Sequence, residues 1–562
     1  MIPVLVVAAY LALVLYVGIF AFRKSKGTGE DYFVASRALG PYVFLLALFG
    51  TNMTAFAILG SSGLAYQRGI GVYGLMASAS GFVIPLTLFF IGTRLWALGK
   101  RHGYMTQVQF FRERWECSAI GTVIFALTAA MLVPYIIIGV MGGGHTLEAL
   151  TTVLGPDGKP ALVEVVRDGR TLLETQHWVS YELGGAVVAL VVMTYVFFGG
   201  MRGTAWVNAL QTSMFLLFGT LAFVLIAKNL GGLDQIIARL AAEPATASLL
   251  TRQRIPMEEF FSYTFIPLSA IMFPHMAIMC LTAQKVTAFK KTVIFYPICI
   301  LLIWLPCVLL GVIAAQQFPG LKPGESDEVI LRLLTANTHV WLAGVLGAAI
   351  MACVMATDSQ ILALGTMFTQ DIFAHYGGRK RFGERVQVWT GRAFVIAITV
   401  VAYLIALRLK DKAGIFELAI RFAFSGFAAL APIMLAALFW KRSTKWGALA
   451  ATLWVLAAML GTWYLHETST NLAPKMGQPL VPIFPELGNL LLRSPGNVLM
   501  YGFLPVLPMC LGSALLMVLG SLLTRPPSAA TLEKFFPSDQ RTASTTEREA
   551  ELPKLEPLHN RE

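Results

Sequence analysis

Two long apolar segments are interrupted half-way along by polar or helix-breaking residues. The first, PYVFLLALFGTNMTAFAILGSSGLAY (41–66), has the run GTNMT at 50–54; the second, FSYTFIPLSAIMFPHMAIMCLTAQK (261–285), has two prolines and a histidine within 267–275. A break in a membrane helix frees backbone carbonyls and amides that can bind a solute or a cation in mid-bilayer. Glycine packing and proline kinks would explain either segment alone. As the first members of two five-helix halves, they predict a solute-binding site.

Three charged residues inside apolar segments could also do chemistry. A carboxylate in the membrane is costly unless it is paired or coordinates an ion. Asp358 therefore either binds a cation or a proton, or accepts structural hydrogen bonds at a helix crossing. Glu417 and Arg421 are four residues apart in GIFELAIRFAFSGF, so on a helix they share a face and can form an ion pair. Alternatively, the planar guanidinium of Arg421 contacts a carboxylate of the solute.

The composition requires that membrane helices carry these residues. Of the 562 residues, 56% are hydrophobic and only 13% are charged, and the mean hydropathy is +0.68. This leaves too little polar surface for a water-soluble globule. We therefore predict an all-α polytopic membrane protein with about thirteen transmembrane helices. The apolar runs lie near residues 1–22, 41–66, 71–98, 118–146, 180–198, 204–229, 260–282, 292–316, 337–368, 389–409, 414–440, 446–466 and 499–523.

The loops set the expected orientation and domain limits. Lys and Arg are more frequent in alternate loops, which places the N-terminus outside and the C-terminus in the cytoplasm of an inner or plasma membrane. Residues 1–523 are expected to form the transmembrane domain, and the polar residues 524–562 a largely disordered cytosolic tail. Between spans, we expect a small β-hairpin within 147–178 and a surface helix at LDQIIARLAAE.

Several classes of function are disfavoured. The net charge of +12 comes from short clusters between apolar runs, which argues against a nucleic-acid partner. The six cysteines form no C-x-x-C pair, and no H-E-x-x-H or G-x-S-x-G motif occurs, so we expect neither an enzyme nor a redox cofactor. The expected partners are a small-molecule solute, a coupling cation and membrane lipid, with no obligate protein partner.

Four ordered blocks of sequence resemble the sodium/solute symporter family. They are DYFVASRALGPYVFLLALFGTNMTAFAILGSSGLAYQRGIGVY, YVFFGGMRGTAWVNALQT (195–212), ATDSQILALGTMFTQDIF (356–373) and FSGFAALAPIMLAALFWKR (424–442). Members of that family carry sugars, proline, pantothenate and monocarboxylates. The resemblance implies a leucine-transporter-like fold of two inverted five-helix repeats, with one helix before them and two after. It also implies a symporter that moves a small organic solute by alternating access.

The resemblance also implies a sodium site between the first broken helix and the helix of Asp358. Its carbonyl donors match Gly50, Met53 and Ala352. The family's two hydroxyl donors fall on Met355 and Ala356, with Thr357 one residue late, and the family's W-T-D is here Trp206-Val207-Asn208. Either Thr357 moves into place, or Asp358 supplies the charge, or transport is coupled to H⁺ or uncoupled.

The solute is expected beside the broken helices. The candidate residues come from three of the spans: Asn52, Thr54, Phe56, Tyr135, Phe273, Pro274 and His275. His275 is either a substrate contact or a satisfied hydrogen-bond partner. Pro274 and His275 replace the polar amide and aromatic gate of the sugar carriers, which favours an organic acid. A solute sensor on the same scaffold is a further alternative.

Overall fold

The computed structural model describes residues 2–24, 27–153, 155, 161–167, 170–410, 414–470, 480–494 and 496–537. Within these ranges, nine helices are long and apolar enough to cross a membrane. They are α1 (Ile2–Arg23), Gly71–His102, α8 (Ser118–Leu150), α9 (Tyr181–Asn229), α15 (Thr287–Gln317), Val340–Ala374, α20 (Gly378–Leu409), Ile415–Phe439 and α24 (Lys445–Thr468). This confirms the all-α membrane class.

The number of spans depends on how broken helices are counted. Two further helix pairs pass the same test as bent units, which gives up to eleven spans in the described ranges, and α25 (Val506–Leu522) is a shorter apolar helix. The 49 residues of α9 are two helices that meet at Gly200, whose φ of 52° and ψ of −150° are not helical. The figure of thirteen stays a prediction.

Some membrane-length units contain several shorter helices. Their parts are α5 (Gly71–Thr87) and α6 (Thr93–His102), then α18 (Val340–Val354) and α19 (Asp358–Met367), then α21 (Ile415–Leu418), α22 (Ser425–Ala429) and α23 (Ala431–Phe439). Most of these junctions are π-helical or 3-10 turns with helical backbone angles, so the chain continues across the bundle without reversing direction.

Both interruptions predicted from the sequence are present. The helix α3 (Pro41–Asn52) ends before Met53, which is extended, and the chain resumes 59° away with a π-helical turn, Phe56–Gly60, and α4 (Ser61–Arg68). In the second segment, α12 (Met257–Tyr263) and α13 (Ser269–Met272) are bent by 48° from α14 (Pro274–Leu281). Pro274 is the first residue of α14, and a proline disfavours helical angles in the residue before it.

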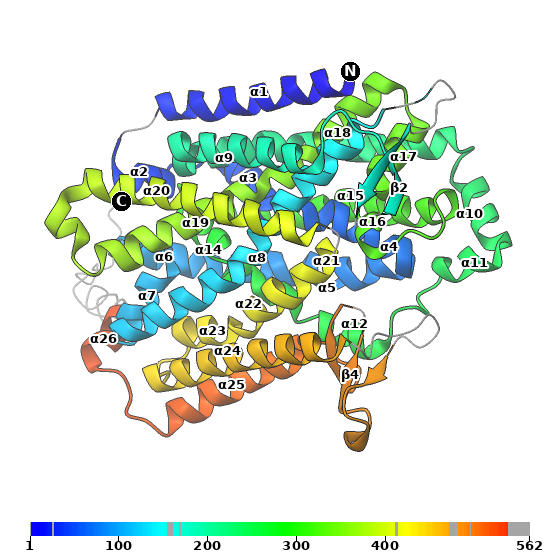
Figure 1. Cartoon of the computed structure of the whole chain (residues 1–562). Helices are drawn as coiled ribbons and strands as arrows, with labels where there is room; N and C mark the ends of the chain where they lie inside the picture. Colours follow the sequence, from blue (N-terminus) through cyan, green and yellow to red (C-terminus); the bar gives the residue numbers. More distant parts are fainter. Residues whose placement is uncertain are drawn as a thin grey trace, which may run out of the picture.

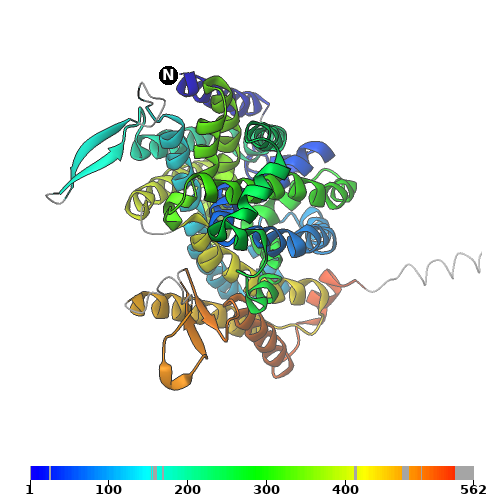
Figure 2. The ribbon, with the colours of Figure 1, turned by 90° about the vertical axis from the view of Figure 1, so that its right-hand side faces the viewer.

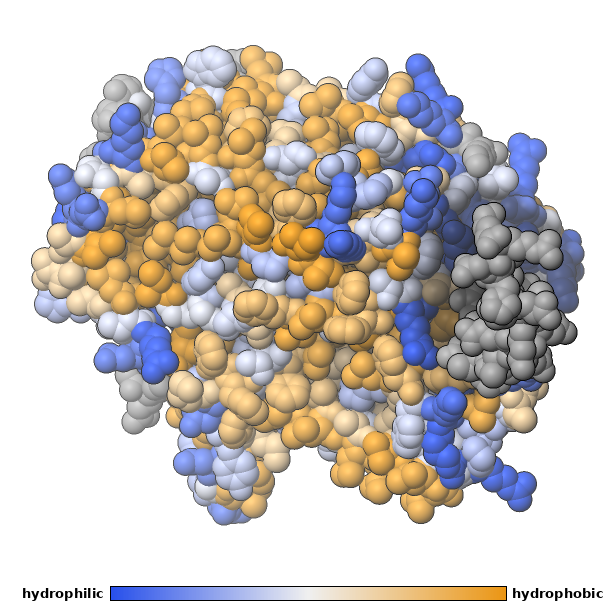
Figure 3. All heavy atoms as spheres, turned by 180° about the vertical axis from the view of Figure 1, so that it is seen from behind, coloured by the Kyte–Doolittle hydropathy of each residue, from blue (hydrophilic) through white to orange (hydrophobic). Residues whose placement is uncertain are grey.

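The long helices lie side by side in one bundle, with α1 along one edge and α24 beside α25 along the other (Figure 1). Figure 3 shows hydrophobic side chains over most of the middle of the bundle and hydrophilic side chains gathered near the two ends of the helices. This distribution suits a protein whose helices cross a bilayer end to end.

The connecting segments agree with two predictions. Strands β1 (Leu162–Arg167) and β2 (Arg170–Thr175) pair antiparallel, which confirms the hairpin, and it projects from the bundle in Figure 2. The predicted surface helix is α10 (Leu233–Ala242). Other short elements include α2 (Gly29–Val34), α11 (Pro244–Ala247), α16 (Pro323–Ser326), α17 (Val329–Asn337), β3 (Val481–Pro482), β4 (Leu491–Arg493) and β5 (Val498–Met500).

The start of the polar tail differs from its prediction. Residues 529–535 form α26 (Ala529–Phe535), which packs on α7 (Gln107–Arg114). Phe535 is buried against the ring of Phe110, and Lys534 pairs with Glu113. Disorder was predicted from average polarity, whereas one buried aromatic side chain is enough to dock a short helix. Residues 538–562 lie outside the described ranges.

Candidate functional site

A small closed cavity lies between the two helix breaks. Both broken segments, together with α5, α15 and the π-helical turn Ala419–Phe424, contribute to its wall. The space open to the centre of a water-sized sphere is about 20 Å³, enough for one or two water molecules. The lining residues are Asn52, Met53, Phe56, Ser80, Ile84, Tyr263, Ile266, Pro267, Ser269, Ala270, Trp304 and Phe424.

The wall of the cavity is mostly apolar, with polar groups from Asn52, Ser80, Tyr263, Ser269 and Trp304, and none of its described lining residues is Asp, Glu, Lys, Arg or His. The amide of Asn52 donates to the hydroxyl of Tyr296 over 2.7 Å. The indole N–H of Trp304 is buried and has no partner within the described residues. A buried donor without an acceptor is costly, so this N–H is suited to a solute oxygen. The described wall therefore offers hydrogen-bonding groups but no formal charge to a solute.

The predicted solute residues divide into two layers. Asn52 and Phe56 line the cavity, whereas the other five are buried outside its lining. Three of these five form a layer of aromatic rings, with Phe273 5.2 Å from Phe424 and 5.4 Å from Tyr135 between ring centres. The five are Thr54, Tyr135, Phe273, Pro274 and His275.

His275 packs in that layer at 4.9 Å from the ring of Phe273. Its side chain is buried, and neither ring nitrogen has a partner within the described residues. The sequence left open that the ring of His275 is a satisfied hydrogen-bond partner, and the described residues show no such hydrogen bond.

The residues matched to the sodium site lie at one junction. The carbonyl of Gly50 accepts from the amide of Met53 at 3.0 Å, and the carbonyl of Met53 accepts from the thiol of Cys353 at 3.2 Å. Cys353 directly follows Ala352 in α18, so α18 faces the break here. No sequence motif indicated this contact of Cys353, because a buried cysteine ordinarily acts as a small apolar side chain.

The hydroxyl of Thr357 points elsewhere. It donates to the carbonyl of Val354 at 3.3 Å and lies against Gly139 of α8. Ala356 is buried and has no side-chain oxygen.

Asp358 is the centre of a buried polar cluster. Its carboxylate accepts from the hydroxyl of Tyr195 at 2.9 Å, from the amide of Asn208 at 3.2 Å, and from the backbone N–H of Ser359 at 2.5 Å. The hydroxyl of Ser359 also accepts from Asn208 and lies 2.8 Å from the hydroxyl of Thr51. The cluster thereby joins α3, α9 and α19.

Among the described residues, this cluster contains a carboxylate without a positively charged partner and amide oxygens without hydrogen-bond donors. Within the described residues, no Lys, Arg or His forms an ion pair with Asp358. The amide oxygens of Asn208 and Gln211 are also buried without a donor there. These two residues are three apart on α9 and therefore lie on one face of that helix. A carboxylate and two amide oxygens are ligands that a hard cation prefers.

The predicted ion pair between Glu417 and Arg421 is not formed in the described structure. The guanidinium of Arg421 instead contacts His466, with Nη1 2.6 Å from Nδ1. The side chain of Glu417 lies against Gly496, so the two side chains meet different neighbours although they are four residues apart. Neither residue lines the cavity.

Polar contacts hold the broken segments at the two ends of the bundle. At the end of α4, Arg68 forms a bidentate ion pair with Glu259 of α12, both distances being 2.6 Å. At the opposite end, the guanidinium of Arg37 donates to the carbonyls of Leu281 at 3.2 Å and Tyr104 at 2.8 Å. These contacts join α4 to α12 at one end and α14 to its neighbours at the other.

Comparisons with known proteins agree with this arrangement. The sequence profile of the Sodium:solute symporter family matches residues 32–167 and 160–454. The Sodium/proline symporter of Escherichia coli (strain K12) is 24% identical over 559 residues, covering 96% of each chain. The Sodium/pantothenate symporter of the same organism is 24% identical over 471 residues, covering 82% of this chain and 90% of that relative.

A solved structure, of a Na⁺-coupled sialic acid symporter in a substrate-bound outward-open state, has a similar fold. The TM-score is 0.67 at 14% identity, covering 94% of this chain and 99% of that chain. The expected leucine-transporter-like architecture is confirmed, and the relatives are transporters rather than enzymes. The profile covers most of the transmembrane region, including both breaks and Asp358, so this chain belongs to the Sodium:solute symporter family.

Proposed function

We propose that this chain is a secondary active symporter that moves a small uncharged or zwitterionic organic solute, driven by Na⁺ bound at the cluster around Asp358. The observation that carries the proposal is a buried carboxylate without an ion-pair partner in the described structure, beside two amide oxygens without donors. A cation at this point would balance the charge and use the acceptors.

The cluster lies close enough to the cavity to couple ion and solute. Thr51 contacts Ser359, and the next residue, Asn52, lines the cavity. Ion binding that orders the end of α3 would therefore also position Asn52 for the solute. Binding of both ligands favours the closed state, and movement of the broken helices against the rest of the bundle then opens the opposite end.

The uncharged wall of the cavity is the basis for the solute class. An anion would meet no opposite charge there, so the organic acid favoured by the sequence gains no support. Proline, which gives its name to one relative, is a zwitterion. The ends of broken helices carry partial charges that suit the two charges of a zwitterion.

Proton coupling is the second candidate, and the contact of Cys353 with Met53 favours it. The thiol of Cys353 donates to the carbonyl of Met53, which the family's sodium site would use as a ligand. Asp358 would then carry H⁺ in place of Na⁺, with the same cluster as the coupling site.

The deciding experiment is uptake by proteoliposomes that contain the purified full chain. Radiolabelled proline, pantothenate, glucose and lactate are each offered with an inward Na⁺ gradient, an inward H⁺ gradient or neither. We expect accumulation of an uncharged or zwitterionic solute under the Na⁺ gradient. Accumulation under the H⁺ gradient alone would identify the second candidate, and equal uptake without any gradient would contradict coupled transport.

A further inference from the structure

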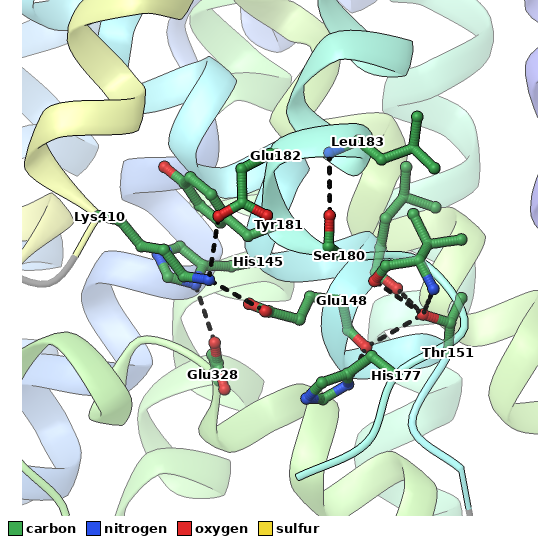
Figure 4. Close-up of polar contacts among 12 residues, drawn as sticks. His145, Glu148, Thr151, His177, Ser180, Tyr181, Glu182, Leu183, Glu328 and Lys410 are labelled. Atoms are coloured by element: carbon green, nitrogen blue, oxygen red, sulfur yellow. Dashed lines mark hydrogen bonds and ion pairs between the residues drawn. The ribbon is translucent and has the colours of Figure 1, made fainter. Parts of the chain in front are cut away.

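A second group of ligand-type side chains lies away from the cavity, at the end of the bundle that carries β1 and β2. Figure 4 shows His145 and Glu148 near the end of α8, with Glu328 facing them from the start of α17. One ligand atom from each of the three residues lies within 4.8 Å of the other two. The imidazole Nδ1 of His145 is 2.8 Å from a carboxylate oxygen of Glu328.

Carboxyl groups outnumber the permanent cations around these three residues. Lys410 lies 3.0 Å from Glu148 and 3.8 Å from Glu182, and Arg332 lies 3.2 Å from Glu328. Asp327 adds a further buried carboxyl beside Glu328. The two permanent cations are therefore fewer than the surrounding carboxyl groups.

We propose that His145, Glu148 and Glu328 bind a divalent transition-metal ion, with Zn²⁺ as the ion that fits best. Imidazole nitrogen and carboxylate oxygen are both donors that Zn²⁺ takes in proteins, and three such ligands leave a fourth tetrahedral position for water. Calcium and magnesium prefer oxygen ligands alone and more of them, so the imidazole selects against both.

Metal binding changes two contacts that the structure shows. The ion takes the place of the proton between His145 and Glu328, so one proton is released to solvent for each ion bound at a pH where that proton is present. The ammonium of Lys410 leaves Glu148 and keeps its contact with Glu182. Lys410 is therefore a competitor of the metal, because it holds one of the three ligands in the free state.

The bound ion connects α8 to the segment of Glu328, which packs on α4, the second half of the first broken helix. His145 and Glu148 belong to α8, whereas Glu328 belongs to the segment that also closes on α21, through the bond from the Ile415 amide to Asp327 at 2.8 Å. A metal that joins α8 to Glu328 holds this end closed and inhibits transport. The expected inhibition depends on the proposed transport function, whereas metal binding itself is independent of the solute and of the coupling ion.

Direct binding tests the site without any transport measurement. The purified full chain in detergent is titrated with Zn²⁺ against a chromogenic chelator, alongside Ca²⁺. We expect one high-affinity Zn²⁺ site that Ca²⁺ does not fill. His145→Ala and Glu328→Gln should each weaken Zn²⁺ at least about 10-fold. Lys410→Met should tighten it, because the competing ammonium is gone.

His177→Ala is the matched control. His177 lies at the same end and donates to the backbone carbonyl of Glu148 at 2.7 Å, but its ring is not one of the three ligands. This variant should bind Zn²⁺ as the parent does, and thermal unfolding of each variant without metal checks that it is folded. Equal Zn²⁺ affinity in the parent, His145→Ala and Glu328→Gln overturns the site, as does weaker binding by Lys410→Met.

Inhibition is tested separately in the proteoliposomes. Micromolar Zn²⁺ added on the side of the hairpin should slow uptake by the parent and leave uptake by folded His145→Ala unaffected. If Zn²⁺ binds at the three residues but uptake is unchanged, the locking role is wrong. If no solute is transported at all, the proposed function fails while the binding result still stands.

Discussion

The hydroxyl of Thr51 lies 2.8 Å from the hydroxyl of Ser359, and this contact joins the break in α3 to the helix that carries Asp358. Thr51 belongs to the penultimate position of α3, directly before Asn52 in the cavity wall. The ion cluster and the solute cavity therefore share one short piece of backbone. A change at either site is expected to alter binding at the other.

Removal of the charge of Asp358 should abolish the dependence of uptake on the cation. Asp358→Asn keeps the size of the side chain and most of its hydrogen bonds but cannot balance a bound cation. We expect solute binding to persist with at least about tenfold weaker stimulation by Na⁺, from the loss of a charged ligand worth about 1.5–3 kcal/mol. Initial uptake rates at increasing Na⁺ concentration measure this. Glu417→Gln, a carboxylate outside the cluster, is the control, and a larger effect there would discredit the assignment.

Replacement of Cys353 tests whether the cation also uses the carbonyl of Met53. The thiol donates to that carbonyl, so Cys353→Ala frees it for a cation. If the carbonyl is a ligand, the Na⁺ concentration for half-maximal uptake should fall several-fold. Cys280→Ala, at another buried cysteine, should leave it unchanged. An unchanged value in Cys353→Ala would restrict the cation to the Asp358 cluster.

The indole of Trp304 should contribute to affinity for the solute. Trp304→Phe keeps an aromatic ring in the wall but removes the N–H that lacks a partner. A typical hydrogen bond contributes about 0.5–1.5 kcal/mol, so we expect KM for the solute to rise about two- to tenfold with little change in maximal rate. Trp341→Phe, at an exposed tryptophan, is the control. An unaltered KM would mean that the solute does not reach this donor.

The features predicted well from sequence are those that local residues determine. The break before Met53 follows from the run of Gly50 and polar residues in an apolar helix, and the break at Phe273 follows from Pro274. Asp358 was identifiable because a carboxylate in an apolar segment is rare. These signals lie within a few residues of the feature that they predict.

The features that sequence reasoning missed depend on packing between distant segments. His145 and Glu328 are 183 positions apart, and no spacing rule brings them together. Trp304 gives no signal because tryptophan is common in membrane helices. The missing ion pair between Glu417 and Arg421 has the same cause, because the guanidinium of Arg421 contacts His466, which is 45 positions away.

The carboxyl of Asp327 should make closure of the hairpin end depend on pH. Burial raises the pKa of Asp327 to about 7, and the bond from the amide of Ile415 only partly offsets this. In an open state the side chain meets water, and its pKa returns toward about 4. The closed state then binds the proton more tightly than the open state. A fall in pH from about 8 through 7 toward 4 therefore favours closure, and a rise in pH through 7 removes this stabilisation of the closed state.

Spin labels on α17 and α12 measure this closure as a distance distribution at pH 5.5 and pH 8. We expect a larger closed population at the lower pH for the parent. Asp327→Asn has no titratable group at this position, so its populations should differ less between the two pH values. Glu328 is a suitable comparison, because burial raises its pKa but the hydrogen bond and charge of His145 and the charge of Arg332 outweigh that effect and lower it. The carboxylate of Glu328 stays ionised between pH 5.5 and 8, so the Glu328→Gln variant should keep the pH response. If the pH response were lost in Glu328→Gln and kept in Asp327→Asn, the assignment to Asp327 would be wrong.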